Sequence, residues 1–305
     1  MLYSLLNSVC LSIYGYTLQG DSIFDEYEDP TMERQLWMKY NYCCGSKGAV
    51  FTNRTQLQDA ISLYVSDYDT ALTSYGDIGC WNVTKVTDMS FLFFDKNSFN
   101  EDIGCWDVSN VLYMANMFSF ASSFNQPIGY WDVSKVRTMQ SMFSGASSFN
   151  QQISDWDVSS VKDMSYMFFQ ATSFDQSISS WDVSSVKYSF SMFAGAHSFN
   201  QYVGGWNLAS DQIISYMFYG ATSFNQNLCG WYKRGMSPTA AVHVLKGSAC
   251  AIATDPDFSA KESFCQSCYT KSSTKIKVAS ASFKSSASLL INIAISVSLA
   301  AFLMK

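Results

Sequence analysis

The chain has 305 residues, enough for two ordinary domains, but charged residues make up only 14% of it, against about 25% in a typical soluble protein. The 25 acidic residues exceed the 19 basic ones and give a net charge of −6, which argues against a nucleic-acid partner held by phosphate contacts. Two histidines leave little room for histidine-based catalysis, whereas nine cysteines indicate an oxidising compartment or a metal site.

The first 80 residues are predicted to hold a leader, a connecting segment and a helical cap. Residues 1–20 are apolar but lack a basic start, which is typical of a weak signal peptide, and residues 21–50 form an N-terminal segment. Within residues 51–80, Thr55 and Gln58 have the spacing of a capping box. One apolar helical face follows, with the Tyr64 hydroxyl expected in water. It consists of Leu57, Ala60, Ile61 and Tyr64.

Residues 81–231 form a repeat with a period of 25 residues. Its most regular column consists of Trp81, Trp106, Trp131, Trp156, Trp181, Trp206 and Trp231. If each tryptophan is position 0 of a unit, apolar residues recur at positions 2, 11, 12, 18 and 22. Chance does not keep several columns in register over this length, and so short a unit cannot bury its apolar face alone. The units are therefore predicted to stack on one another.

Two periodicities alternate within a unit. Trp131 and Val133 are apolar while Asp132 and Ser134 are polar, which predicts a short strand around position 0. Positions 8, 11, 12 and 15 have the spacing of a short helix. In the third unit they are Met139, Met142, Phe143 and Ala146. We therefore expect an α/β solenoid that is leucine-rich-repeat-like, with about six coils of a short strand plus a short helix.

Two polar columns accompany the apolar ones. Position 19 carries Asn or Asp in every unit, from Asn100 to Asn225, and position 17 always carries Ser, from Ser98 to Ser223. We interpret both as turn residues whose side chains bond to backbone groups along the stack.

The unit Phe-Asn-Gln-x-Ile-x-x-Trp-Asp-Val-Ser-x-Val-x-x-Met-x-x-Met-Phe-x-x-Ala is intact from Phe124 to Ala146. It resembles the repeat of BspA-type leucine-rich-repeat surface proteins, and the resemblance covers about residues 51–268. It implies a leucine-rich-repeat-like solenoid on a cell surface or in a secreted protein. It implies no single activity, because members of that family are largely uncharacterised or are described as adhesins.

Cysteines mark both ends of the repeat. Residues 232–268 are predicted to form a C-terminal cap, as in proteins of the family that the chain resembles. The cysteines around it are Cys229, Cys250, Cys265 and Cys268. Four thiolates could hold a zinc ion, but we favour disulfides. Cys80 and Cys105 each precede a tryptophan, so we expect them on adjacent coils, about 4.8 Å apart and joined by a disulfide.

The C-terminal sequence predicts membrane attachment. Residues 269–288 are a Ser/Lys-rich spacer, and the apolar tail 289–304 would span only about 24 Å as a helix, short of the ~30 Å hydrocarbon core. This favours a GPI-attachment signal, whereas the lysines before the tail would suit a tail-anchored protein that faces the cytosol. Asn53 and Asn82 begin glycosylation sequons. We expect a membrane-anchored protein on the cell surface.

Position 1 of the units carries an outward column of acidic and amide side chains. The candidate ligand face consists of Asp107, Asp132, Asp157, Asp182 and Asn207, and Asn82 precedes it. Aligned carboxylates could bind calcium. In water, however, neighbours about 5 Å apart repel by only about 1 kcal/mol per pair, so the column needs no cation. We expect structural or solvated aspartates.

The sequence contains no recognisable catalytic constellation, no glycine-rich phosphate loop after a strand and no histidine pair at metal spacing. We expect no cofactor, no metal and no enzymatic activity, and we expect a monomer. The predicted function is recognition or adhesion at the cell surface, through a polar, acidic solenoid face that binds a protein or a glycan. A structural spacer without a ligand is the alternative, and a carbohydrate-active enzyme is the least favoured.

Overall fold

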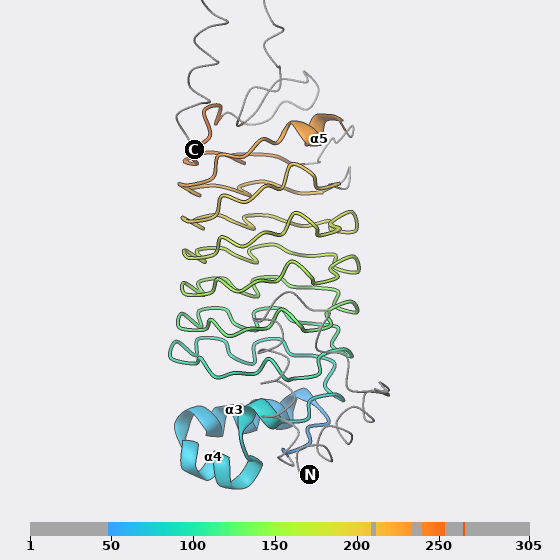
Figure 1. Cartoon of the computed structure of the whole chain (residues 1–305), viewed down its shortest axis with the longest axis vertical. Helices are drawn as coiled ribbons and strands as arrows, with labels where there is room; N and C mark the ends of the chain where they lie inside the picture. Colours follow the sequence, from blue (N-terminus) through green and yellow to red (C-terminus); the bar gives the residue numbers. More distant parts are fainter. Residues whose placement is uncertain (1–47, 209–211, 234–239, 254–264, 266–305) are drawn as a thin grey trace, which may run out of the picture. The chain divides into compact units, whose positions relative to one another are not determined.

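Figure 1 shows a computed structural model of the chain, which describes residues 48–208, 212–233, 240–253 and 265. The chain divides into two units, Met1–Cys268 and Tyr269–Lys305, and every described residue lies in the first. The helical elements of this part are α3 (Arg54–Ser66), α4 (Tyr68–Tyr75), the 3-10 turn η2 (Ile78–Cys80) and α5 (Cys229–Lys233). None of these helices is long and apolar enough to cross a membrane. The predicted signal peptide, the spacer and the apolar tail lie outside the described residues.

The helix α3 packs against the first coil of the repeat, where the cap was predicted (Figure 1). Its predicted apolar face is buried. The Tyr64 ring meets the Trp81 ring edge-on at 6.0 Å between centroids, and Nε2 of Gln58 donates to the Leu92 carbonyl at 3.3 Å. Tyr64 is only 7% exposed and burial raises the pKa of its hydroxyl, so the ring is packed as expected.

The cap of α3 lies two residues before the predicted one. Oδ1 of Asn53 accepts the N–H of Gln56 at 3.0 Å, and Oε1 of Gln56 accepts the N–H of Thr52 at 3.1 Å. Asn53 has extended backbone immediately before the helix, which is the conformation that an N-cap needs. Thr55 already lies inside the first turn, so the Thr55–Gln58 box was wrong.

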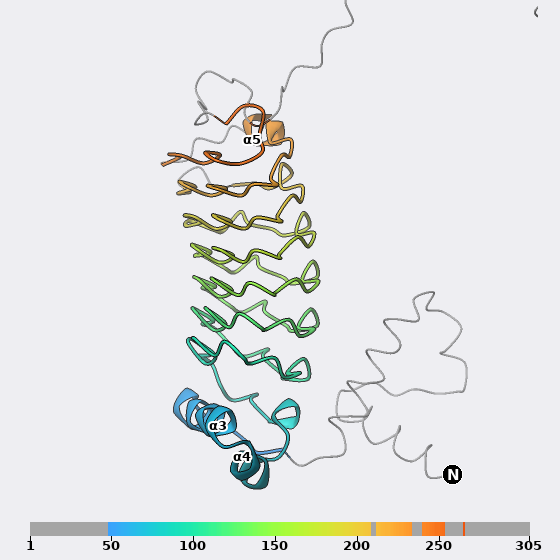
Figure 2. The same cartoon turned by 90° about the vertical axis from the view of Figure 1, so that its left-hand side faces the viewer.

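From Trp81 onward the chain runs in successive coils, each reaching from one tryptophan to the next (Figures 1 and 2). Single parallel bridges join position 7 of each coil to the same position of the next. They connect Asp88, Tyr113, Thr138, Asp163, Tyr188 and Ile213 in order. At the start of the stack, Val50 pairs with Asn82 in the same parallel sense. The described units therefore lie side by side in chain order.

Between η2 and α5, the structure forms neither a helix nor a strand longer than one bridge in the residues that it describes. The N–H groups at positions 8, 10, 12 and 14 donate to carbonyls of the next coil, as Asn116 does to Gln140 at 2.8 Å and Phe118 to Met142 at 2.9 Å. These groups are therefore not free to bond four residues back, as a helix requires. The predicted short helix is a run of turns, and the predicted strand at position 0 is irregular backbone.

The residues expected in the core are nevertheless buried. Met139, Met142, Phe143 and Ala146 have no exposed surface. The ring of Phe143 stacks on Phe118 and Phe168 of the neighbouring coils, in each case with 5.6 Å between centroids. Stacked pairs of this kind add about 0.5–1.5 kcal/mol each beyond the burial itself.

Two ladders of side-chain hydrogen bonds connect the coils. From Trp106 to Trp231, each indole Nε1–H donates to the carbonyl 28 residues earlier, as Trp156 does to Ile128 at 3.1 Å. Position 19 forms the second ladder: Oδ1 of Asn125 accepts the N–H of Asn150 at 2.8 Å, which confirms the predicted role of this column. The hydroxyl bonds that recur between coils come from position 16, as from Ser147, rather than from the serine at position 17.

The stack continues past Trp231, beyond the predicted end of the register. Ile213 forms a parallel bridge with Ala240, which is 27 residues later instead of 25, and Phe218 donates to the Val244 carbonyl at 2.8 Å. Val244 is completely buried. Residues 240–247, expected to belong to a separate cap, therefore form part of a seventh coil that contains a two-residue insertion.

Candidate recognition surfaces

The aspartates of the predicted ligand face each close a turn of their own coil. Oδ1 of Asp107, Asp132, Asp157 and Asp182 accepts the N–H of the serine two residues later, at 3.0–3.1 Å. Asn82 does the same with Thr84 at 3.1 Å, and Asn207 is exposed. Asp and Asn favour such turns because their short side chains reach the backbone two residues on. One oxygen of each carboxylate is therefore already bonded within the turn.

Hydrogen bonds lower the pKa of two carboxyl groups in this column. The Ser159 hydroxyl and N–H hold the pKa of Asp157 below its ordinary value, opposed by desolvation and by the charge of Asp182. Ser184 lowers the pKa of Asp182 in the same way. Within the described ranges, no three His, Cys, Asp or Glu side chains come close enough together to hold a metal ion. The carboxylates form a row of separate turns and do not converge on one point.

A second surface was not predicted. We call it the aromatic face: the outward side chains of positions 7, 9, 10, 13 and 14, together with their counterparts in the seventh coil. Its exposed large side chains are Phe91, Phe94, Tyr113, Phe120, Tyr188, Tyr219 and Val242. Aromatic residues alternate here with small and polar residues from coil to coil, including Asp88 and Asp163 at position 7, so no regular column marks the surface. A search of the turn segments for non-core aromatics would have found it.

The rings of the aromatic face touch one another across coils. Tyr166 and Phe190 lie 5.2 Å apart between centroids, Phe190 and Tyr216 5.4 Å, and Tyr216 and His243 5.3 Å. His243, which was expected in a separate cap, thus lies on this face. The row runs over four successive coils and fixes the ring orientations.

A basic column borders the aromatic face. Position 6 directly precedes the first position of the face, and in three successive coils it carries the exposed side chains of Arg137, Lys162 and Lys187. The acidic column lies at position 1, five residues earlier in each coil. The basic and acidic columns therefore lie at different positions of the coil, and Asp163 adjoins the basic one at position 7.

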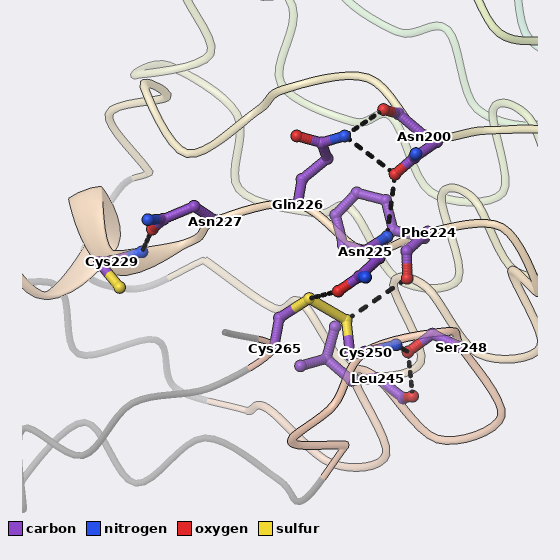
Figure 3. The surroundings of a disulfide bond; sticks show 10 residues. All are labelled: Asn200, Phe224, Asn225, Gln226, Asn227, Cys229, Leu245, Ser248, Cys250 and Cys265. Atoms are coloured by element: carbon purple, nitrogen blue, oxygen red, sulfur yellow. Dashed lines mark hydrogen bonds between the residues drawn. A yellow bond between two sulfur atoms is a disulfide. The ribbon is translucent and has the colours of Figure 1, made fainter. Parts of the chain in front are cut away.

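The structure joins Cys250 to Cys265 by a disulfide, which excludes a four-cysteine zinc site that uses this pair as thiolates. Figure 3 shows the bond at the end of the Asn ladder. The Cys250 sulfur lies 3.5 Å from the Phe224 carbonyl oxygen, and the Cys265 sulfur lies 3.8 Å from Oδ1 of Asn225. Because disulfide sulfurs carry no hydrogen, these are close contacts and not hydrogen bonds. The disulfide lies at the end of the core, where the regular repeat ends.

The structure does not form the predicted Cys80–Cys105 bond. Cys80 is a half-buried thiol, whereas Cys105 is disulfide-bonded, as is Cys229. The partners of Cys105 and Cys229 lie outside the described residues, as does Cys268. The prediction that Cys80 and Cys105 lie on adjacent coils was correct, since the rings of the tryptophans that follow them stack with 6.4 Å between centroids. Adjacent positions alone did not determine which cysteines pair.

The asparagine side chains of the two sequons both accept hydrogen bonds from nearby residues. Asn53 is the N-cap of α3 and Asn82 closes a turn with Thr84, and in both cases the acceptor is Oδ1. Both side chains are exposed. Since a glycan is attached through the amide nitrogen, these turns leave the attachment atom uninvolved in the bonds described.

The family model described as "Mycoplasma protein of unknown function, DUF285" matches residues 61–171 and 151–242. The two matches together span residues 61–242, more than half of the 305 residues, and cover most of the coil stack. Searches of curated proteins and of solved structures found no match.

Proposed function

The chain belongs to the family described as "Mycoplasma protein of unknown function, DUF285", which is related to BspA-like surface repeat proteins, and we propose that it is a non-enzymatic recognition or adhesion module. In this proposal the coil stack is a leucine-rich-repeat-like solenoid that presents one long side to a protein or glycan. Several coils would each contribute one or two side chains, as in other repeat proteins.

The observation that carries this proposal is the aromatic face. Tyr166, Phe190 and Tyr216 are half-buried and contact each other across coils. Tyr113, Tyr188 and Tyr219 of the same face are exposed. Soluble monomers rarely expose contiguous apolar surface unless it serves an interaction. A spacer without a ligand gains nothing from such a surface, so the aromatic face favours recognition over the structural alternative. The acidic column supports a contact surface less strongly, because its carboxylates also serve the turns.

The proposal is tested with the full-length chain immobilised through its N-terminus, and with two probes: a glycan array and a phage library of random peptides. Recognition predicts saturable binding by the folded chain to a ligand from one of the two collections. The same chain reduced and unfolded in urea, then diluted into the assay, is the control. If neither collection gives saturable binding, the chain is a spacer and the proposal is wrong.

We also propose that the protein lies on the cell surface, because the cysteines of the described part form disulfides, with Cys80 as the exception. In this proposal the C-terminal tail attaches the protein to the membrane. A phosphatidylinositol-specific phospholipase should then release the chain from intact cells. Antibody access only after permeabilisation would instead support a tail-anchored protein facing the cytosol.

A further inference from the structure

Four aromatic residues of the aromatic face have a left-handed backbone conformation. The φ angles are 64° at Phe91, 61° at Phe120, 59° at Tyr166 and 60° at Tyr216. A bulky side chain in this region is an outlier because its Cβ crowds the following backbone. Strained residues of this kind persist where the surrounding structure enforces them, and they concentrate at functional sites.

The coils close without aromatic residues at these positions. Asn116, Ser141 and Ser191 occupy position 10 of other coils, and position 14 is glycine in the third, fifth and sixth coils. These residues accept left-handed backbone at lower cost. The turn therefore does not require Tyr166 or Tyr216, and the chain retains two tyrosines where an asparagine would serve the fold at least as well.

The rings are also held in place before any partner arrives. Tyr166, Phe190 and Tyr216 form a continuous row with His243, and Tyr219 packs against Tyr216 at 5.7 Å. We call these five residues, with Phe169 beside Tyr166, the C-terminal aromatic cluster. Side chains that are already ordered lose little freedom on binding, which is why rigid aromatics dominate contact surfaces.

Charge distinguishes the centre of the cluster from its border. The cluster itself carries no carboxylate or ammonium group. Lys162 and Lys187 occupy position 6 of its first two coils, and Arg137 occupies that position one coil earlier. The carboxylate of Asp163 lies between the cluster and this column, where its Oδ1 accepts the Ser165 N–H at 2.8 Å, so the border carries one negative charge beside the lysines. An uncharged aromatic centre with a charged border is the arrangement of protein–protein contact surfaces. The basic side chains of this border favour acidic groups on the opposite surface.

We propose that the C-terminal aromatic cluster binds a protein partner that offers apolar side chains edged by carboxylates. This deepens the proposed recognition function and rests on it. A glycan fits less well, because the rings of Tyr166 and Phe190 are tilted by 58° and those of Phe190 and Tyr216 by 53°, so they present edges instead of one flat platform. The N–H groups along this strip are also largely bonded within the stack.

The test uses the full-length chain, a phage library of random peptides and a glycan array. The test variant is the double substitution Tyr166→Asn and Tyr216→Asn, which introduces the residue that the second coil carries as Asn116. Tyr202→Asn is the control, since it replaces an exposed tyrosine of the fifth coil that lies outside the aromatic face. We expect selected peptides to be acidic and rich in large apolar residues. Their affinity should fall about tenfold or more in the double variant and remain nearly unchanged in Tyr202→Asn.

Two further measurements make the result decisive. The melting temperature of the double variant should be no lower than that of Tyr202→Asn, so that lost affinity is not lost folding. Lys162→Gln with Lys187→Gln should weaken peptide binding and reduce its dependence on salt. Selected peptides without excess acidic residues would contradict the charge argument.

The remaining outcomes separate this inference from the proposed function. Peptides that bind both aromatic variants as tightly as the wild type would overturn the inference and leave recognition intact. Glycans that bind the wild type and are lost in the double variant would replace the protein partner by a glycan. Failure of both collections to give any saturable ligand would overturn both proposals.

Discussion

The Asn ladder gives the sharpest stability prediction. Oδ1 of Asn125 accepts the N–H of Asn150 at 2.8 Å and Nε2 of Gln151 at 3.0 Å, in a part-buried site between the second and third coils. Asn125→Ala removes that acceptor. In this variant Nε2 of Gln151 can still donate to the backbone carbonyl of residue 125, at 2.8 Å in the wild type, so the Asn150 N–H is the main group that loses its acceptor. Leaving such a group without a partner costs about 1–3 kcal/mol. We expect the free energy of unfolding to fall by about 2 kcal/mol, or the melting temperature by about 4–8 °C.

Asn125→Asp is the matched control, because a carboxylate oxygen can accept the same two bonds. The column already contains one such residue: Oδ1 of Asp175 accepts the Asn200 N–H at 2.8 Å. The neighbours of Asn125 in the column, Asn100 and Asn150, are neutral, so the new charge meets no like charge there. Urea unfolding followed by tryptophan fluorescence measures both variants. Equal losses for Ala and Asp, or no loss for Ala, would refute the ladder.

Three further predictions address the acidic column and the end of the stack. The folded-state pKa values of Asp157 and Asp182 lie below the ordinary value, so their turns stabilise the fold above about pH 4 and lose that effect as the pH falls through the lowered pKa. Replacing both by Asn should therefore flatten the acid-induced fall of the melting temperature, and an unchanged profile would contradict this assignment. Changing Cys250 and Cys265 together to Ser opens a loop with a sequence separation of 15 and should lower the free energy of unfolding by about 3 kcal/mol in urea titrations. A variant as stable as the wild type would show that the bond does not stabilise the stack. EDTA should leave the melting curve of the wild type unchanged, since the carboxylates already bond within their turns, and a fall of several degrees would reveal a bound cation.

The sequence predicted what is buried much better than which backbone buries it. Met139, Met142 and Phe143 are in the core as expected, yet they lie on consecutive turns. Apolar spacing fixes which side chains share a face, and a helix and this run of turns place the same residues inward. The helix and the run of turns differ in their hydrogen bonds: a helical N–H bonds within its own segment, whereas here the Phe118 N–H donates to the Met142 carbonyl of the next coil. The spacing of apolar residues carries no information on that choice.

The features that sequence reasoning missed have specific physical causes. The seventh coil escaped notice because two inserted residues shift Val244 out of the 25-residue register. The aromatic face escaped because Tyr166 and Tyr216 share their position with serines and asparagine in other coils. The Asn ladder was found because bonds between coils need the same residue type in every coil, whereas a contact surface does not.

The stacking of successive coils is tested most directly by nuclear Overhauser contacts between tryptophan side chains in the full-length chain. The rings of Trp156 and Trp181 have centroids 6.4 Å apart and planes inclined by 3°, and Nε1 of Trp181 lies 3.0 Å from the Ile153 carbonyl oxygen. We expect cross-peaks between the ring protons of these two tryptophans, and from the Trp181 indole N–H to backbone protons next to Ile153. Indoles that show contacts only to residues near them in sequence would contradict the stacked arrangement.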